Sequence, residues 1–236
     1  MASLAPRSHS LVPSVFDLCT PRSDVLKGVT DADFAADLAK VIRGVAGDEY
    51  QKPDKFFDNT YPTRGLQNLL TNVCAGLSGA GTEAAAIFRL DTSYGGGKTH
   101  GLIALVHAAN GMKGVSNVSE FINPNLVPKS TVRVAAFDGE NADPANGRSM
   151  GEGVFAHTPW GEIAYGLAGQ TGYERLRRSD EQMVAPGAET IAELFGNEPT
   201  LILLDELSVY LRKGDGCGAR CWRSANCVPD IPFQSS

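Results

Sequence analysis

The feature that most restricts the fold of this chain is a glycine-rich segment set between two apolar stretches. Residues 91–100, DTSYGGGKTH, follow the apolar run 84–90 and lead directly into a second apolar stretch, 102–109. A loop between a strand and a helix points consecutive backbone N–H groups at one place, where the helix dipole favours an anion. Glycines let a ligand approach the backbone closely because they carry no Cβ. The segment therefore predicts a phosphate-binding loop between a strand and a helix.

Seven residues of this segment are candidates for binding a nucleotide: Tyr94, Gly95, Gly96, Gly97, Lys98, Thr99 and His100. The Lys98 ammonium would reach the β- and γ-phosphates and take part in catalysis, and the Thr99 hydroxyl would join the ligands of Mg²⁺. Thr92 stands where the usual G-x-x-x-x-G-K-[ST] pattern has its first glycine, so the first turn of the loop is expected to differ. The alternative is a glycine-rich turn that binds nothing.

A second motif lies about a hundred residues further along the chain. Residues 201–207, LILLDEL, place two adjacent carboxylates after four aliphatic residues, which is typical of a buried strand with a polar end. Asp205 would bind Mg²⁺ directly or through water, and Glu206 would polarise the water that attacks the γ-phosphate. A simple acidic strand end is the alternative. The two motifs in this order predict a P-loop ATPase with ATP and Mg²⁺ as cofactors.

Apolar runs and helical patterns alternate in the second half of the chain, which predicts a parallel sheet covered by helices. The predicted strands are 84–90, 132–137 and 201–204. Between the last two strands, helices are expected to begin near Pro159 and Pro186. The predicted fold class is therefore α/β, with the parallel sheet of a P-loop NTPase flanked by helices and preceded by an N-terminal helical segment.

The part of the chain before the glycine-rich segment predicts helices. Apolar residues recur at helical spacing after Thr30, which is placed to cap a helix that Gly44 would end. A second apolar stripe covers 66–77, and residues 50–64 between the two are expected to form a loop whose aromatic side chains pack against the following domain. The predicted domains are a disordered start at 1–13, a helical segment at 14–81, a P-loop ATPase core at 82–213 and an irregular tail at 214–236.

Other polar residues are weaker candidates. His100 and His107 lie seven residues apart after the glycine-rich segment, and without a third ligand they are expected to be solvated or packed rather than metal-bound. Four residues after the second predicted strand could touch Mg²⁺ or a partner, although an acidic loop is favoured: Asp138, Glu140, Asn141 and Asp143. Glu162 is expected to be stabilised by the helix dipole, because it lies in the first turn of its helix. The three cysteines in 217–227 are too few and too irregularly spaced for a zinc site.

Composition excludes several classes of protein. With 236 residues and 42% hydrophobic residues, the chain can bury the core of one or two domains. The formal net charge is -6 and no block of Lys or Arg occurs, so the sequence carries no electrostatic signature of nucleic-acid binding. No stretch approaches the roughly 20 apolar residues of a membrane span, and the start lacks the apolar region of a signal peptide. A cytoplasmic location without a membrane partner, and reduced thiols, are expected.

Four segments taken together resemble a known family: 56–66, 91–100, 158–165 and 203–212. They look like the N-terminal part of large predicted AAA+-type ATPases of bacteria and archaea, and the resemblance covers residues 14–213. It implies that the glycine-rich loop and the Asp-Glu strand bind and hydrolyse ATP with Mg²⁺. It also suggests a link to DNA methyltransferase or phage-defence loci, and a protein or DNA partner bound through the full-length protein.

The end of the chain departs from this family pattern. ATPases with an adjacent catalytic Glu place a further strand between the two motif-bearing strands, and that strand follows the Asp-Glu strand in sequence. Residues 214–236 contain no run of four apolar residues to form it. The sheet is therefore expected to be incomplete, the chain to be truncated and the tail to be foreign to the fold, with no polar sensor residue and no arginine finger.

Three functions are compatible with these motifs. An ATPase module that acts on a macromolecular partner accounts for both of them. A nucleotide-binding or interaction fragment without turnover accounts for the tail, because a sheet that lacks its middle strand leaves backbone groups unpaired. A small-molecule kinase ranks third, since the paired Asp205 and Glu206 favour water over a substrate hydroxyl as the phosphate acceptor. The sequence does not indicate an oligomeric state.

Overall fold

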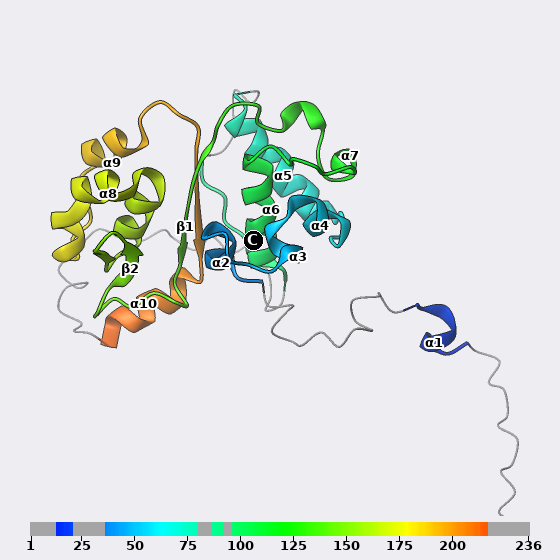
Figure 1. The fold of residues 1–236 in the computed structure, drawn as a ribbon, viewed down its shortest axis with the longest axis horizontal. Helices are drawn as coiled ribbons and strands as arrows, with labels where there is room; N and C mark the ends of the chain where they lie inside the picture. The colour runs from blue at the N-terminus through cyan, green and yellow to red at the C-terminus, as the bar shows by residue number, and fades with distance from the viewer. Residues whose placement is uncertain (1–12, 21–35, 80–85, 92–95, 217–236) are drawn as a thin grey trace, which may run out of the picture. The chain divides into compact units, whose positions relative to one another are not determined.

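The computed structural model describes residues 13–20, 36–79, 86–91 and 96–216 (Figure 1). The chain divides into two units, Met1–Ala35 and Ala36–Ser236. The described part of the first unit contains one short helix, α1 (Val15–Leu18). All the predicted site residues belong to the second unit.

In its described ranges, the second unit combines helices with two pairs of strands. Its elements in chain order are α2 (Leu38–Ile42), α3 (Asp48–Gln51), α4 (Pro53–Asp58), α5 (Arg64–Leu77), α6 (Lys98–Ala109), α7 (Val118–Phe121), the 3-10 helix η3 (Pro124–Leu126), β1 (Arg133–Asp138), β2 (Arg148–Gly151), β3 (Val154–Ala156), α8 (Pro159–Glu181), α9 (Ala188–Phe195), β4 (Thr200–Asp205) and α10 (Leu207–Gly216). Within the described ranges, no helix has the length and apolar character needed to cross a bilayer.

The parallel pair β1 and β4 forms the centre of the unit. Its register runs from Arg133 opposite Thr200 to Asp138 opposite Asp205, so both strands end at the same level. Figure 1 shows α2, α5 and α6 on one side of the pair and α8 and α9 on the other. Helices on both sides of a parallel pair confirm the predicted α/β class.

The side that faces α2 and α6 carries the largest core cluster. Leu201 and Leu203 of β4 are buried there, because alternate residues of a strand point to the same face. Every residue of α6 from Gly101 to Ala109 is buried as well. A helix that is apolar on all sides belongs in the interior, which fits the position of α6 between the sheet and α5.

Two aromatic side chains from α4 complete this core. Phe56 and Phe57 are fully buried, with ring centroids 5.2 Å apart in an edge-to-face arrangement. The expected packing of aromatics from residues 50–64 is therefore confirmed for Phe56 and Phe57, whereas Tyr61 is 81% exposed. The expected loop is wrong over Pro53–Asp58, which is helical because Pro53 at the first position presets a helical φ.

The opposite side of the sheet packs against α8, α9 and α10. The small Ala135 of β1 lets the helices approach closely, and its cluster includes Leu167, Leu176 and Leu194. Two residues further along β1, Phe137 meets Tyr210 of α10 edge-on, with ring centroids 5.2 Å apart. This contact fixes α10 at the carboxyl end of the strands.

The strand predictions are confirmed in two places and wrong in one. The strands predicted at 132–137 and 201–204 are β1 and β4, with slightly different ends. The strand predicted at 84–90 is absent from 86–90, the part of that range that the structure describes. A strand requires a partner for its backbone groups, and among the described residues β4 pairs with β1 alone. Ile87 is accordingly 88% exposed.

The first predicted helix begins later than expected. α2 starts at Leu38, because the Asp37 carboxylate accepts a hydrogen bond of 2.9 Å from the backbone N–H of Lys40 and so caps the helix there. Thr30, the predicted cap, lies outside the described residues. Gly44, with a φ of 74°, follows the helix end as predicted, and α5 confirms the second predicted helix.

Three features of the second half were not predicted. The antiparallel pair β2 and β3 turns through Glu152, a non-glycine residue with a φ of 51°. Helix α8 continues to Glu181 across a break at Ala168 and Gly169, where the backbone is not helical. Helix α10 continues to Gly216, beyond the predicted end of the core at 213. The starts of α8 and α9 lie close to the predicted positions.

A buried carboxylate ties the two ends of α8 together. Asp180, which has no exposed surface, accepts hydrogen bonds from the backbone N–H of His157 at 3.0 Å and of Thr158 at 2.9 Å. The Thr158 hydroxyl and the Tyr173 hydroxyl donate to it as well, the latter at 2.9 Å. A buried charge is tolerated only when it is fully hydrogen-bonded, so this network fixes the entry to α8.

We expect Asp180→Ala to lower the free energy of unfolding by at least about 2–3 kcal/mol, because it leaves several buried donors without an acceptor. Urea unfolding followed by circular dichroism measures the change. Glu181→Ala, on the next and exposed residue, is the matched control and should have little effect. Equal midpoints for the two variants would contradict the role of Asp180.

Candidate functional site

The carboxyl ends of β1 and β4 bring two acidic residues side by side. Asp138 and Asp205 are register partners at the last paired position of the sheet. Asp138 is only 9% exposed and Asp205 only 7%. The backbone N–H of Gly139 donates to the Asp205 carbonyl at 3.0 Å, which continues the pairing for one more residue. Polar groups at the carboxyl edge of a parallel sheet are where α/β proteins commonly build sites.

The glycine-rich segment and the Asp-Glu motif meet at this edge. The Thr99 hydroxyl donates a hydrogen bond of 2.7 Å to Oδ2 of Asp205, across 106 residues of sequence. The other carboxylate oxygen of Asp205 accepts from the backbone N–H of Glu206 at 3.1 Å. Thr99 lies in the first turn of α6 and Asp205 ends β4, so this bond links the helical layer to the sheet.

The start of α6 has the features of an anion-binding helix terminus. Gly97 precedes the helix with a φ of 73°, a left-handed conformation that glycine adopts without strain. A Cβ added there would meet no atom of the described residues within 4 Å. Lys98 forms no hydrogen bond or ion pair with any residue in the described ranges. Tyr94 and Gly95 of the predicted site lie outside those ranges.

Glu206 has an unusual backbone next to this edge. Its φ of 46° lies in the left-handed region, which is uncommon for a residue with a side chain. Glu206 is exposed, and its carboxylate accepts no hydrogen bond from the described part of the chain. Non-glycine residues held in this region cost of order 1–3 kcal/mol and persist where the surrounding structure fixes them.

The surrounding structure fixes Glu206 through a glycine. A Cβ built on Gly139 would lie 2.2 Å from the carbonyl oxygen of Glu206 and 3.1 Å from Cβ of Tyr210. Only glycine therefore allows the segment after β1 to lie against the segment after β4. Gly139 did not appear among the predicted site residues, because nothing local in the sequence indicates a contact made so far along the chain.

Asp138 is held by its own loop. Its carboxylate accepts hydrogen bonds from the backbone N–H of Glu140 at 2.9 Å and from the Asn141 amide at 2.5 Å. Both of its oxygens therefore accept hydrogen bonds from the same loop. The carboxylate of Asp205, in contrast, faces the helix that follows the glycine-rich segment.

A second buried carboxylate lies near Asp138. Glu162, in the first turn of α8, has an ion pair of 3.1 Å with Arg148 of β2 and is only 3% exposed. Burial raises the pKa of Glu162 to about 7, an effect that the Arg148 charge opposes and the Asp138 charge reinforces. The expected dipole contact at the helix start is thus combined with an ion pair that the sequence did not indicate.

The two histidines of α6 are packing residues. The His100 ring stacks on Phe56 with a centroid distance of 4.4 Å, and its Nε2 lies 2.9 Å from the Thr60 hydroxyl. His107 Nε2 lies 2.9 Å from the backbone carbonyl of Tyr50. Burial lowers the pKa of both imidazoles, which favours their neutral forms at pH 7. His100, predicted to bind a nucleotide, thus uses its side chain to hold α6 against α4.

A depression of about 280 Å³ lies elsewhere, at the other end of β1. Its lining includes Arg133, Arg175 and Glu193. The guanidinium groups of both arginines are paired with glutamates, Arg133 with Glu198 at 3.1 Å and Arg175 with Glu193 at 4.0 Å. Both arginines of the depression are thus engaged, and the carboxyl edge of the strands is the candidate site.

These features define an α/β protein with a small parallel sheet and a polar site at its carboxyl edge. Residues 16–220 match the family described as the DUF499 N-terminal domain. The chain belongs to this family. Neither the comparison with curated proteins nor that with solved structures returns a match.

Glycine-to-alanine substitution tests the close contact at Glu206. We expect Gly139→Ala to lower the free energy of unfolding by about 1–3 kcal/mol, because the new methyl group overlaps the Glu206 carbonyl. Thermal or urea unfolding measures this loss. Gly65→Ala is the control, since a Cβ at Gly65 in α5 meets no atom within 4 Å. A Gly139→Ala protein as stable as the control would show that the two segments are not in contact.

Stability should depend on the ionisation of Glu162. Its pKa is higher in the folded chain than in the unfolded one, so the folded state binds the proton more tightly. Stability should therefore fall as pH rises from about 4.5 to about 7, and level off above that. Glu162→Gln should flatten this part of the profile when urea midpoints are compared across pH. Parallel profiles for the two proteins would contradict the raised pKa.

Proposed function

We propose that this chain is an ATP-binding module with Mg²⁺-dependent ATPase activity, a P-loop protein of AAA+ type that acts on a macromolecular partner. The observation that carries the proposal is the 2.7 Å hydrogen bond between Thr99 and Asp205. It joins two motifs that the sequence independently associates with phosphate binding and with Mg²⁺ binding. Two unrelated turns would have no reason to bring these side chains together.

The donor set at this edge fits Mg²⁺. Thr99 and Asp205 offer a hydroxyl and a carboxylate oxygen, and Mg²⁺ prefers hard oxygen ligands together with phosphates and waters. When bound, the ion would neutralise charge that develops on the phosphates. The existing hydrogen bond already holds both oxygens on the same side of the strand end. Little rearrangement of these two side chains is therefore needed.

The start of α6 supplies complementary positive charge. The Lys98 ammonium has no partner among the described residues, and the first backbone N–H groups of the helix add the positive end of its dipole. Gly95, Gly96 and Gly97 would let the phosphates approach the backbone. Together these groups would bind and orient a triphosphate.

In this proposal, Glu206 acts on water. Its carboxylate is exposed, free of hydrogen bonds from the described residues, and directly follows the residue assigned to Mg²⁺. A free carboxylate can accept a proton from a bound water and orient it toward a phosphate. The left-handed backbone of Glu206 sets the direction of this side chain relative to β4.

A specific observation favours a second candidate, nucleotide binding without turnover. β4 has one strand neighbour among the described residues, and Leu204 on this strand is 47% exposed. A catalytic edge beside a strand with a single neighbour is less rigid than one inside a continuous sheet. Binding requires only the groups near α6, whereas hydrolysis also requires Glu206 to be held in place.

The partner is proposed to be a protein or DNA, bound through the full-length protein. This part of the proposal rests on the AAA+ resemblance alone. The net charge of -6 gives this chain no general attraction for nucleic acid.

Substitution of the lysine and the glutamate tests the proposal and separates its two forms. We expect Lys98→Ala to weaken ATP binding at least about tenfold, equivalent to about 1.4 kcal/mol. Glu206→Gln should leave binding unchanged and lower the rate of phosphate release by about 10²–10⁴, the contribution of a general base. Calorimetry measures binding, and a phosphate assay with and without Mg²⁺ measures turnover.

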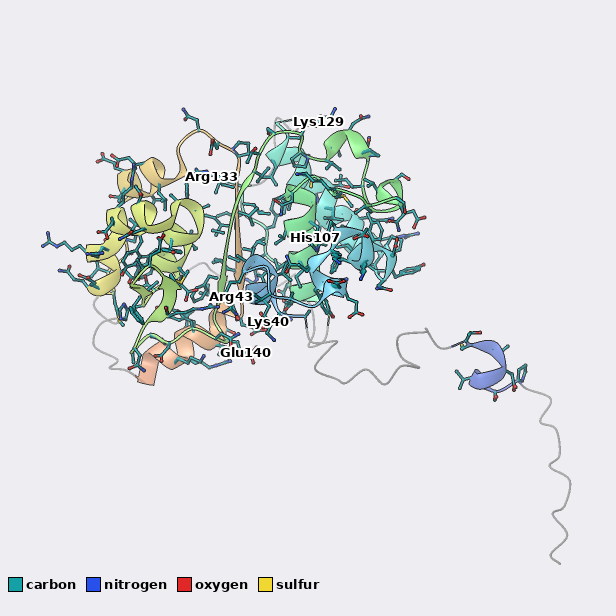
Figure 2. The ribbon with its side chains drawn as sticks, viewed as in Figure 1. Lys40, Arg43, His107, Lys129, Arg133 and Glu140 are labelled. Carbon is teal, nitrogen blue, oxygen red and sulfur yellow. The ribbon has the colours of Figure 1, made fainter. Side chains whose placement is uncertain are left out.

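Lys129→Ala is the matched control for Lys98→Ala. Lys129 is exposed and lies on the opposite side of the second unit from Glu140, as Figure 2 shows. Its substitution removes the same charge and should change neither binding nor turnover. Binding that survives Lys98→Ala as well as Lys129→Ala would refute the site. Binding without any phosphate release in the unsubstituted protein would select the second candidate.

A further inference from the structure

Lys213 of α10 makes an unusual set of contacts. Its ammonium donates hydrogen bonds to the backbone carbonyls of Gly139 at 3.3 Å and Ala142 at 3.2 Å, and also to that of Glu140. Three carbonyls from one short segment therefore converge on a single cation. Figure 2 shows Glu140 beside α10, at the end of the sheet opposite Arg133.

The segment that Lys213 holds is the one that contacts the candidate site. The backbone N–H of Gly139 donates a hydrogen bond to the carbonyl of Asp205. A Cβ at Gly139 would collide with the carbonyl of Glu206. Glu140 donates its backbone N–H to Asp138 at 2.9 Å. A displacement of this segment would therefore disturb the ends of both β1 and β4.

Lys213 also belongs to the helix that begins immediately after Glu206. The Glu206 carbonyl accepts hydrogen bonds from the N–H groups of Val209 at 2.9 Å and Tyr210 at 3.4 Å. The Tyr210 ring in turn packs against Phe137 at the end of β1. Residue 206 is thus part of a ring of contacts. β4 leads through residue 206 into α10, Lys213 of α10 binds the segment after β1, and that segment is hydrogen-bonded to the end of β4.

We propose that Lys213 is a positioning residue for Glu206. The left-handed backbone of Glu206 is held in place by Gly139, and Lys213 fixes Gly139 through its carbonyl and those of its neighbours. Lys213 does not touch the proposed reacting atoms. It acts by keeping the segment after β1 pressed against residue 206, so that the carboxylate keeps one direction. This inference rests on the proposed function of Glu206.

The chemistry of the contact explains why a lysine occupies this position. The ammonium group has three N–H donors on a flexible stem, which matches three carbonyl acceptors that point at one spot. Hydrogen bonds from a charged donor are stronger than those from a neutral one. Methionine would preserve the length of the stem and remove all three bonds, whereas arginine would preserve the charge and some of the donors.

The test compares Lys213→Met and Lys213→Arg with the unsubstituted protein. The control is Arg212→Ala, since Arg212 is the preceding exposed residue on α10 and donates to none of these carbonyls in the described chain. Steady-state ATP hydrolysis gives kcat and KM, and amide hydrogen exchange reports on residues 139–142. A thermal melt of each variant shows whether it remains folded.

We expect Lys213→Met to lower kcat by about 10–100-fold, the effect of a small misplacement of a catalytic group. KM should stay within about twofold, because phosphate binding at α6 does not involve Lys213. Exchange at residues 139–142 should become faster. Lys213→Arg should recover a large part of kcat, and Arg212→Ala should behave as the unsubstituted protein.

Three results would overturn the proposal. The first is an unchanged kcat in Lys213→Met while the unsubstituted protein turns over, which would leave the proposed ATPase function intact. The second is an equal loss in Lys213→Met and Lys213→Arg with a lower melting temperature in both, which would assign Lys213 to stability alone. The third is no turnover in the unsubstituted protein, which would remove the ATPase function together with this inference.

Discussion

The hydrogen bond from Thr99 to Asp205 is the interaction on which the arrangement of the site depends. The bond is 2.7 Å long and joins residues 106 positions apart in the sequence. It is made where α6 begins and β4 ends. The helical layer and the sheet are otherwise joined by apolar contacts, which do not specify direction. A directional bond at this place aligns the start of the helix with the carboxyl edge of the strands.

The groups around this bond differ in how far they are satisfied. Asp138 and Asp180 have their carboxylates fully engaged by neighbouring donors, as buried charges require. Lys98 and Glu206, on either side of the bonded pair, have charged side chains that no described residue engages. Free charges next to a fixed pair are what a site needs if its ligand is charged, and this contrast is the physical basis of the proposed nucleotide site.

Sequence patterns predicted the elements whose signals are local. The strands β1 and β4 and the helix α5 follow from periodicity. The prediction of a strand before the glycine-rich segment was wrong over 86–90, because an apolar pattern does not reveal whether a partner strand is present. Lys213 and Gly139 were beyond prediction, since their roles arise from contacts between segments about 70 residues apart.

The most direct test of a single Mg²⁺-nucleotide site is a double-mutant cycle on Thr99 and Asp205. The dissociation constant of ATP is measured with and without Mg²⁺ for Thr99→Val, Asp205→Asn, the double variant and the unsubstituted protein. Shared binding of one ion predicts that the double variant loses little more affinity than the weaker single variant, and only when Mg²⁺ is present. Additive losses, or losses of equal size without Mg²⁺, would contradict the account.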